Sequence, residues 1–248
     1  MKVVVIGGTG LIGSRVVAEL TGHGHEAVAA SPSTGVDTLT GEGLAEVMKG
    51  ASVVVDVTNS PSFADDAVLD FFRRSTANQL EAEREAGVAH HVALSVVGTD
   101  RLQEAGYFRA KQTQEEMIRD SGVPFSIVRA TQFFEFAQGL ADSATQGDTV
   151  SVAPIKIQPM FSGDVAAAVA RTAVGAPVGG IVEVAGPEAF DLEDFIRRAL
   201  AVHGDPRTVV TDPQGQYWGA TLKDSDLLPG PDASIGATSL TQWSERQA

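Results

Sequence analysis

The stretch from Val3 to Gly13 constrains the fold of this chain more than any other. A short apolar run over residues 3–6 has the length and composition of a buried parallel strand, and it stops at two consecutive glycines. The residues that follow, beginning with Leu11 and Ile12, have the apolar spacing of a helix. A strand, a glycine turn and a helix in this order predict the first β-α unit of a doubly wound α/β sheet.

The glycines of this turn stand three apart, at Gly7, Gly10 and Gly13. The first allows the tight turn, the second lets the backbone approach a phosphate, and the third lets the helix pack against the strand. The N–H groups and the positive dipole end of the helix favour a pyrophosphate. A glycine turn with no ligand is the alternative. We predict a dinucleotide site made by Gly7, Thr9, Gly10, Leu11, Ile12 and Gly13.

Composition excludes several other classes of protein. The chain has 248 residues, of which 43% are hydrophobic, and this is enough for one large α/β domain or two small ones. The formal net charge of −14 disfavours nucleic acid as a partner. The absence of Cys excludes disulfides and thiol catalysis, and the pair His23 and His25 has no third metal ligand beside it. With no apolar run of membrane-spanning length and no signal peptide, we expect a cytoplasmic protein without a metal or a membrane partner, acting on a small molecule.

Strand and helix patterns alternate along most of the chain. Strands are expected at about residues 2–6, 26–30, 36–40, 51–57, 91–97, 125–131, 181–185 and 208–211, with a strand-like run at 150–157 that Pro154 breaks. Helices are expected at about 11–21, 44–49, 63–86, 107–120, 164–174 and 191–200, the last capped by Asp191. The predicted fold is a Rossmann-type, doubly wound, mostly parallel sheet with a small C-terminal substrate lobe. Residues 1–152 would form the NAD(P)-binding core, and 153–248 the lobe, interleaved with the last core strand in one compact unit.

The end of the second strand bears on the choice of cofactor. In this fold an acidic residue there would hold the adenosine ribose, and a basic residue would hold a 2′-phosphate. This chain has neither, but Ser31, Ser33 and Thr34 can donate to either group. Arg15, in the first helix, is the nearest cation along the chain. Hydroxyls without a carboxylate favour NADP(H) over NAD(H).

A second polar turn follows the predicted strand over residues 51–57. Because the carboxyl ends of central parallel strands lie beside the cofactor crevice, we expect Thr58, Asn59 and Ser60 to contact the cofactor. The same residues with Pro61 would also suit the N-cap and turn of the next helix, and the two roles are compatible.

Tyr107 and Lys111 stand four apart at the start of a predicted helix, so both side chains point the same way. A nearby ammonium would lower the pKa of the tyrosine hydroxyl, which is otherwise near 10. Lysine can also hold the nicotinamide ribose, and Ser95, at the end of the preceding strand, could orient a carbonyl. Together the three residues would form the proton relay of a hydride-transfer enzyme. His90 and His91 lie at the opposite end of that strand and are expected to be structural.

These residues resemble the short-chain dehydrogenase/reductase superfamily, and more closely its atypical NmrA-like and isoflavone-reductase-like branch. The resemblance covers about residues 2–200. Besides the glycine turn, segments typical of the branch are Val128-Arg129-Ala130-Thr131-Gln132-Phe133, Gln158-Pro159-Met160 before Asp164-Val165-Ala166, and Val182-Glu183-Val184-Ala185-Gly186-Pro187.

The resemblance implies a Rossmann fold that binds NADP or NAD, and Thr131 joins the expected cofactor contacts. Some members of the branch reduce quinones, carbon–oxygen or carbon–carbon double bonds, whereas others are nucleotide-binding redox sensors without turnover. Members often lack the tyrosine, so its presence at position 107 favours an NAD(P)H-dependent reductase. The sensor is the alternative, and the sequence assigns no oligomeric state.

Aromatic side chains cluster just past the strand over residues 125–131. Phe133 and Phe134, with Met160 further on, are expected to line an apolar substrate pocket. Core packing of the following helix is the alternative for the cluster. An apolar pocket would suit a small apolar carbonyl or quinone.

Overall fold

A computed structural model describes residues 1–218 and 220–247 of the chain. Within it the chain forms two compact units, each made of three segments. Unit 1 comprises residues 1–95, 106–129 and 165–182, and unit 2 comprises 96–105, 130–164 and 183–248. The predicted division at residue 152 is therefore not a boundary of either unit.

A seven-stranded sheet carries the α/β fold. Its strands run in the order β12-β9-β5-β4-β3-β1-β2, and the described pairings within it are parallel. The strands are β1 (Lys2–Ile6), β2 (Glu26–Ala30), β3 (Val53–Asp56), β4 (His90–Val96), β5 (Phe125–Ala130), β9 (Gly180–Ala185) and β12 (Ser234–Ile235). In register, Val4 of β1 pairs with Val28 on one side and Val54 on the other. The order reverses at β1, which places a topological switch point beside the glycine turn.

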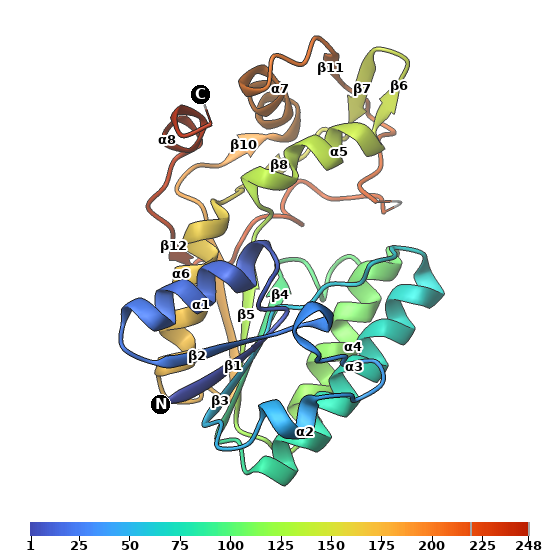
Figure 1. The fold of residues 1–248 in the computed structure, drawn as a ribbon. Helices are drawn as coiled ribbons and strands as arrows, with labels where there is room; N and C mark the ends of the chain where they lie inside the picture. Colours follow the sequence, from blue (N-terminus) through green and yellow to red (C-terminus); the bar gives the residue numbers. More distant parts are fainter. Residues whose placement is uncertain (219, 248) are drawn as a thin grey trace. The chain divides into compact units, whose positions relative to one another are not determined.

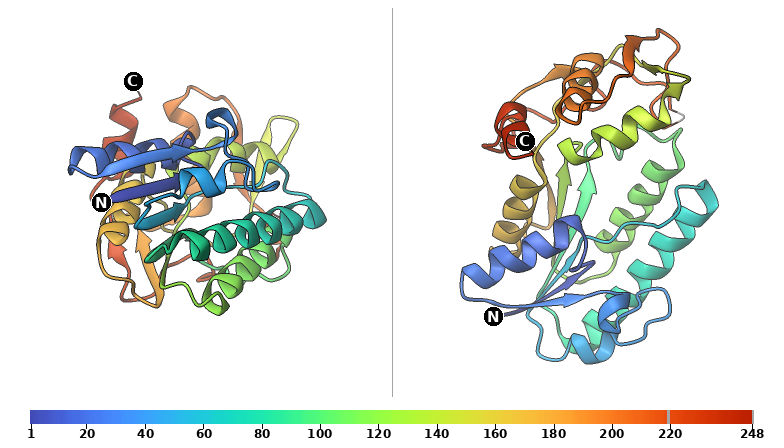
Figure 2. Two further views of the ribbon diagram at one scale, coloured as in Figure 1. Left: turned by 60° about the horizontal axis from the view of Figure 1, so that its bottom comes forward. Right: turned by 45° about the horizontal axis from the view of Figure 1, so that its top comes forward.

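Helices of unit 1 cover both faces of its part of the sheet. Figures 1 and 2 show α1 (Leu11–Gly22) and α6 (Ser162–Val174) on one face and α3 (Asp65–Ala86) and α4 (Gly106–Asp120) on the other. The short α2 (Leu44–Val47) precedes β3. Because both faces are covered, Val3, Val4 and Val5 are fully buried, which explains their continuous apolar run.

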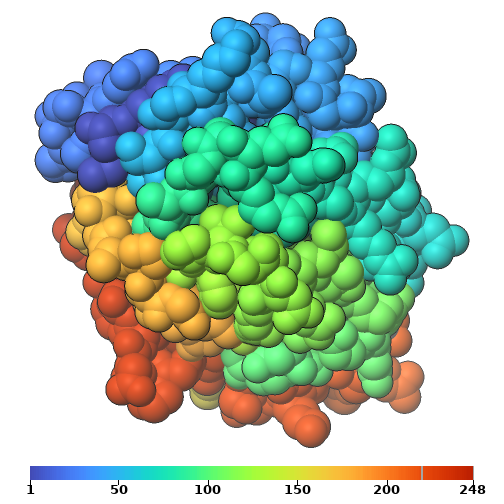
Figure 3. All heavy atoms as spheres, turned by 90° about the horizontal axis from the view of Figure 1, so that it is seen from below, coloured from blue at the N-terminus to red at the C-terminus, as the bar shows by residue number. Residues whose placement is uncertain are grey.

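The pair α3 and α4 forms the layer that carries most of the predicted catalytic residues. In the space-filling view of Figure 3 the teal atoms of α3 lie directly against the green atoms of α4. Val68 and Phe72 of α3 pack against Ala110 of α4 in a buried apolar cluster. Both helices also bury polar side chains, including Gln79, Glu83, Lys111, Gln114 and Glu115. A buried polar side chain requires a partner, and these partners define the site described below.

Unit 2 contains short elements around an aromatic core. They are η2 (Phe134–Phe136), α5 (Ala137–Ser143), β6 (Thr145–Gln146), β7 (Thr149–Val152), β8 (Lys156–Ile157), β10 (Phe190–Asp191), α7 (Leu192–Val202), β11 (Thr208–Thr211) and α8 (Leu240–Glu245). The predicted interruption at Pro154 separates β7 from β8. The Phe134 ring lies 6.3 Å from Phe195 and 5.6 Å from Trp243, and all three side chains are buried.

One local prediction is wrong. Residues 36–40 form no strand, because the Asp37 carboxylate accepts a hydrogen bond from the Leu39 N–H at 2.7 Å and so folds the chain into a turn. Asp191 is the N-cap residue of α7, as predicted, although its side chain makes no capping hydrogen bond. Its carboxylate instead pairs with the Lys156 ammonium at 2.9 Å.

Candidate functional site

The glycine turn has the close-packed geometry that its spacing predicts. Gly7 has a φ of +80°, and its N–H donates to the Ala30 carbonyl at 2.8 Å, which ties the end of β1 to the end of β2. The Gly10 N–H donates to the Gly7 carbonyl at 3.0 Å. A Cβ on Gly13 would lie 2.1 Å from that same oxygen, so only glycine fits where α1 passes over the turn.

The start of α1 is open on its outer side. Thr9, Gly10 and Leu11 are exposed, whereas Ile12 and Gly13 are buried against the sheet. The first turn of α1 carries no acidic side chain that would occupy or repel an anion site. Backbone N–H groups at a helix start, with space for close approach, fit the pyrophosphate of a dinucleotide. The residues of this turn therefore fit the pyrophosphate of NAD(P).

A second turn lies directly against the glycine turn. A Cβ on Gly7 would lie 3.1 Å from the Val57 carbonyl oxygen and 3.2 Å from the Thr58 nitrogen. The turn is held from below by Asp56, which is 1% exposed at the end of β3. One carboxylate oxygen of Asp56 accepts from the Thr58 N–H at 2.9 Å and from the Thr58 hydroxyl at 2.7 Å. Asp56 thus fixes both the backbone and the side chain of Thr58.

The two residues after Thr58 differ in exposure. Asn59 is exposed, and its side-chain oxygen accepts from the Ser60 N–H at 3.0 Å. The Ser60 hydroxyl is buried and donates to the Ser62 carbonyl at 2.7 Å. Ser60 therefore closes the turn before α3. This structural role is compatible with a cofactor contact, which stays a prediction.

The end of β2 presents hydroxyl groups in a rigid turn. The Ser31 N–H donates to the Thr34 hydroxyl at 2.9 Å, and the Ser31 and Ser33 hydroxyls lie 2.9 Å apart. Ser31 is buried, whereas Ser33, Thr34 and the Arg15 side chain on α1 are exposed. Adenosine-end contacts by Ser31 and Arg15 stay predictions.

Tyr107 lies at the start of α4 among aromatic rings. Its ring centroid is 5.6 Å from that of Phe63, 6.2 Å from that of Phe72 and 5.8 Å from that of Phe108. Burial raises the pKa of Tyr107 to about 12. The expectation that Lys111 lowers this pKa is therefore wrong, and the tyrosine hydroxyl stays protonated through neutral pH.

Lys111 is 2% exposed, one turn further along α4. Its ammonium donates to the Leu94 carbonyl at 2.8 Å and to the Gln114 side-chain oxygen, and it lies 4.5 Å from the centre of the Phe72 ring. Burial lowers the pKa of Lys111 to about 8, against the opposing effects of Asp56 and Glu115. The side chain is thus held beside the carboxyl end of β4, on the same helix as Tyr107.

Ser95 points into a buried charged cluster. Its hydroxyl donates to the Glu115 carboxylate at 2.7 Å. Glu115 also accepts from Arg129 at 2.8 and 2.9 Å and from Arg119 at 2.9 Å. The single hydroxyl proton of Ser95 is committed to this cluster, which argues against its predicted role as a hydrogen-bond donor to substrate.

The two histidines of β4 are structural, as expected. His91 and Glu83 are completely buried, with an imidazole nitrogen 2.8 Å from a carboxylate oxygen. Burial would lower the pKa of His91, but Glu83 outweighs it and raises the pKa above its ordinary value. His90 contacts the Ser126 hydroxyl at 2.9 Å.

Thr131 and Phe133 belong to unit 2. Thr131 is 1% exposed and donates its N–H to the Val184 carbonyl at 3.0 Å, while its hydroxyl has no partner among the described residues. An unpartnered buried hydroxyl is compatible with its predicted cofactor contact, which stays a prediction. Phe133 is half-buried, with its ring 5.1 Å from that of Phe136.

Phe134 and Met160 are core residues rather than pocket walls in this structure. Each is 1% exposed, and the Phe134 ring packs on the rings of unit 2 named above. Their predicted place in a substrate pocket is therefore corrected to core packing, because a side chain that is 1% exposed presents almost no surface to a ligand.

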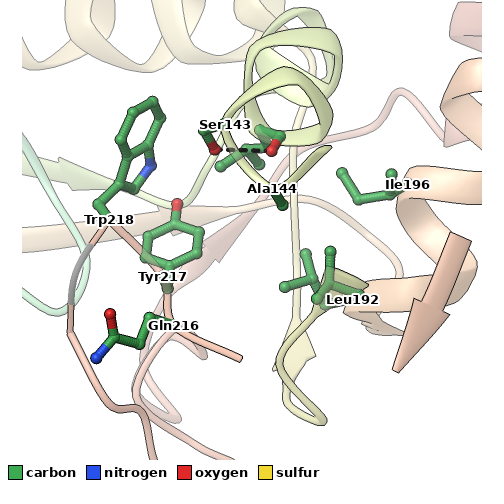
Figure 4. A pocket seen from close by; sticks show the side chains of 9 residues that line it. Ser143, Ala144, Leu192, Ile196, Gln216, Tyr217 and Trp218 are labelled. Carbon is green, nitrogen blue, oxygen red and sulfur yellow. Dashed lines mark hydrogen bonds between the residues drawn. The ribbon is translucent and has the colours of Figure 1, made fainter. Parts of the chain in front are cut away.

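One pocket of unit 2 lies elsewhere. It is shallow: its empty space of about 280 Å³ includes open solvent. Figure 4 shows Tyr217 and Trp218 on one side of it, with Leu192 and Ile196 of α7 across from them. None of the three predicted pocket residues lines it; its lining residues are Leu140, Ser143, Ala144, Val152, Leu192, Ile196, Gln216, Tyr217 and Trp218.

Sequence reasoning missed Asp56 and Gln114. Asp56 lies in the predicted strand over residues 51–57 and Gln114 in the predicted helix over residues 107–120, and neither has a predicted role. One signal was present, because a carboxylate that directly follows three valines in a buried strand needs donors from elsewhere in the chain. Within the described residues there is no cluster of three metal-ligating side chains, and no helix combines the length and apolar character that crossing a membrane requires.

Two known proteins with similar sequences are reductases. A reductase from Streptomyces griseus, acting on (4-alkanoyl-5-oxo-2,5-dihydrofuran-3-yl)methyl phosphate, is 29% identical over 223 residues, covering 82% of this chain and 74% of that protein. A chloroplastic divinyl chlorophyllide a 8-vinyl-reductase from Oryza sativa subsp. indica is 32% identical over 174 residues, but this chain spans only 43% of its length.

A solved structure shares the fold. The NADPH-dependent quinone oxidoreductase of Escherichia coli, complexed with NADPH, superposes with a TM-score of 0.67 at 21% identity, covering 86% of this chain and 78% of that one. The model of a family described as NAD(P)H-binding matches residues 7–173, which include both turns, Tyr107 and Lys111. The chain therefore belongs to this NAD(P)H-binding family, and the two relatives named above, from Streptomyces griseus and Oryza sativa subsp. indica, are reductases.

Proposed function

We propose that this protein is an NAD(P)H-dependent reductase of a small, apolar carbonyl compound. The observation that carries the proposal is the arrangement on α4. Lys111 is held beside the end of β4, and Tyr107 lies one helical turn before it with a protonated hydroxyl that has no hydrogen-bond partner among the described residues. A binding group and a proton donor on one rigid helix suit a site that must be preorganised.

The cofactor's binding residues follow from the two turns. The N–H groups of the glycine turn would hold the pyrophosphate, Thr58 and Asn59 would contact the adjacent part of the dinucleotide, and Lys111 would hold the nicotinamide ribose. When bound, the reduced nicotinamide supplies a hydride, which carries two electrons. Ser31 and Arg15 would face the adenosine end, and their hydroxyl and guanidinium groups favour NADP(H).

Tyr107 would supply the proton that completes the reduction. Hydride addition to a carbonyl carbon leaves an alkoxide oxygen, a much stronger base than a phenolate, so a tyrosine with a pKa of about 12 can protonate it. A quinol is itself a phenol, with an ordinary pKa near 10, and would not need this proton. A measured requirement for the Tyr107 hydroxyl would therefore favour a carbonyl substrate over a quinone.

The names of the relatives support a reductase that acts on unsaturated, carbonyl-bearing compounds. The Streptomyces griseus substrate carries an alkanoyl group on an oxo-dihydrofuran ring, and the plant enzyme is named for reduction of a vinyl group. We therefore extend the proposed substrate class to ketones conjugated with a carbon–carbon double bond.

Loss of NADPH or NADH absorbance with a panel of aldehydes, ketones, enones and quinones tests the proposal. The chain has two tyrosines, so Tyr217→Phe is a matched control for Tyr107→Phe. Tyr107→Phe is expected to lower kcat at least about a hundredfold, the scale of a lost general acid, while Tyr217→Phe stays near the wild type. Equal turnover in Tyr107→Phe would remove Tyr107 from the mechanism.

A nucleotide-binding redox sensor without turnover is the second candidate. It is favoured by Ser95, whose hydroxyl serves the Glu115 cluster and leaves the predicted catalytic trio incomplete. The sensor predicts that NADPH binds with a dissociation constant that differs from that of NADP⁺, with no oxidation by any member of the panel.

A further inference from the structure

A continuous chain of hydrogen bonds links Lys111 to the turn after β3. The Lys111 ammonium donates to the side-chain oxygen of Gln114, and the Gln114 side-chain nitrogen donates to Asp56 Oδ2 at 2.9 Å. The other oxygen of Asp56 holds the N–H and the hydroxyl of Thr58. Gln114 is 1% exposed, so the two hydrogen bonds that it makes are not exchanged readily for water.

The amide is the chemical group that this position requires. An ammonium only donates hydrogen bonds, and an ionised carboxylate only accepts them. A primary amide does both, and its orientation is fixed here because its oxygen must face Lys111 and its nitrogen must face Asp56. Gln114 therefore transmits the attraction between a buried cation and a buried anion that do not touch.

The other charges near Lys111 and Asp56 have ion-pair partners of their own, although Glu115 also raises the pKa of Lys111 and Asp56 also raises that of His91. Glu115 of α4 is neutralised by Arg129 and Arg119, and Glu83 of α3 is paired with His91 of β4. Among the described residues no Lys or Arg forms an ion pair with Asp56, whose four hydrogen bonds come from Thr58, Gln79 and Gln114. A buried carboxylate needs a nearby positive charge, and Lys111 is the one that reaches it through Gln114.

We infer that Gln114 is a positioning residue of the cofactor site: it joins Lys111 to Asp56 and Thr58, so that the ribose-binding ammonium and the β3 turn are held as one rigid unit. The inference rests on the proposed function only for the role of Lys111 toward the cofactor. The coupling of Lys111 to Asp56 belongs to the protein alone and is measurable without cofactor.

The chain offers a matched control in Gln79. Its side-chain nitrogen donates to the same oxygen of Asp56 at 3.2 Å and to the Ser75 hydroxyl at 2.9 Å, and it is completely buried. Unlike that of Gln114, its side-chain oxygen accepts no hydrogen bond from Lys111 or any other described residue. If the amides near Asp56 only fill space and satisfy the carboxylate, Gln79→Met and Gln114→Met should behave alike. If Gln114 positions Lys111, Gln114→Met should change the titration of Lys111 and Gln79→Met should not.

The first measurement is the titration of Lys111 by NMR in protein labelled with ¹³C at the lysine ε-carbon. The lysines are Lys2, Lys49, Lys111, Lys156 and Lys223, and the signal of Lys111 is identified by its loss in Lys111→Met. Gln114→Met should move the Lys111 midpoint down by at least about one pH unit, since the lost bond is charge-assisted. Gln114→Glu should move it up, because a carboxylate replaces the amide oxygen. Gln79→Met should leave it near the wild-type value.

The second measurement is the dissociation constant for NADPH, followed by its fluorescence. Gln114→Met is expected to weaken binding at least about tenfold, the equivalent of one charge-assisted hydrogen bond, and Gln79→Met less than about twofold. The inference would be overturned if Gln79→Met and Gln114→Met changed the Lys111 midpoint and the NADPH dissociation constant equally. It would also be overturned if the Lys111 midpoint stayed unchanged in both Gln114 variants. If the wild-type protein does not bind NADPH, the proposed function fails, and the titration still decides the coupling by itself.

Discussion

The imidazole of His91 and the carboxylate of Glu83 lie 2.8 Å apart with no exposed surface on either side chain. The pair joins β4 to α3. Because Glu83 raises the pKa of His91 above its ordinary value, the folded protein binds a proton here that the unfolded chain releases near pH 6.5.

This pair predicts a pH dependence of stability with a definite sign. Its contribution is fully present below pH 6.5 and is lost as the pH rises through the raised pKa of His91. Glu83→Gln should lower the free energy of unfolding by about 3 kcal/mol at pH 6, as expected for a broken buried pair, and by less at pH 9. Urea unfolding at both pH values checks this, with the exposed Glu81→Gln on the same helix as the control. An equal loss at pH 6 and pH 9 would show that His91 is not protonated in the folded protein.

Gly13→Ala should greatly weaken cofactor binding, although it adds only one methyl group. The added methyl group would lie 2.1 Å from the Gly7 carbonyl, so either α1 or the turn must move. We expect a loss of about 1–3 kcal/mol in folding stability and at least about a hundredfold in NADPH affinity, since the cradle itself is displaced.

Gly22→Ala is the control for that substitution. Gly22 lies in the same helix, and a Cβ there would meet nothing within 4 Å. NADPH titrations should find its affinity near that of the wild type. Tight NADPH binding by Gly13→Ala would place the cofactor elsewhere.

Arg15→Gln should change the affinities for NADPH and NADH to different extents. If the guanidinium faces a 2′-phosphate, its removal weakens NADPH by about tenfold, the loss of one charge-assisted contact, and leaves NADH unchanged. Parallel fluorescence titrations with both cofactors provide the test. A proportional loss for NADPH and NADH would assign Arg15 to the shared pyrophosphate, and no loss for either would remove it from the site.

Phe134→Ala should destabilise the protein, whereas Phe136→Ala should not. Phe134 is 1% exposed in the core of unit 2, and truncation of such a ring costs about 3–5 kcal/mol. Phe136 is 48% exposed, so its removal should change the free energy of unfolding by less than about 1 kcal/mol. Chemical denaturation of both variants distinguishes the corrected core role of Phe134 from the predicted pocket role, which would instead raise KM with little loss of stability.

The elements that sequence predicted best are those fixed by local signals. The glycine turn, the valine strands and the Rossmann-type sheet follow from residue spacing alone, and the structure confirms them. The predicted strand at 36–40 failed because a single side chain, Asp37, captures backbone N–H groups that a strand would need.

The interior of the site depended on contacts between distant parts of the chain. Asp56 meets Gln79 and Gln114, which stand 23 and 58 residues away, and no periodicity within one helix reveals such a meeting. The same limit explains Ser95: its position at the end of a strand was clear, but the Glu115 carboxylate that accepts its hydrogen bond comes from the next helix.

Transfer of deuterium from NADPH labelled at C4 of the nicotinamide to an enone or ketone substrate tests the central claim most directly. The account predicts one deuterium on carbon in the product of the wild-type protein, a proton from solvent on oxygen, and at least about a hundredfold slower transfer in Tyr107→Phe. NADPH that binds at the glycine turn and transfers no deuterium to any carbonyl compound would contradict the account and leave a nucleotide sensor in its place.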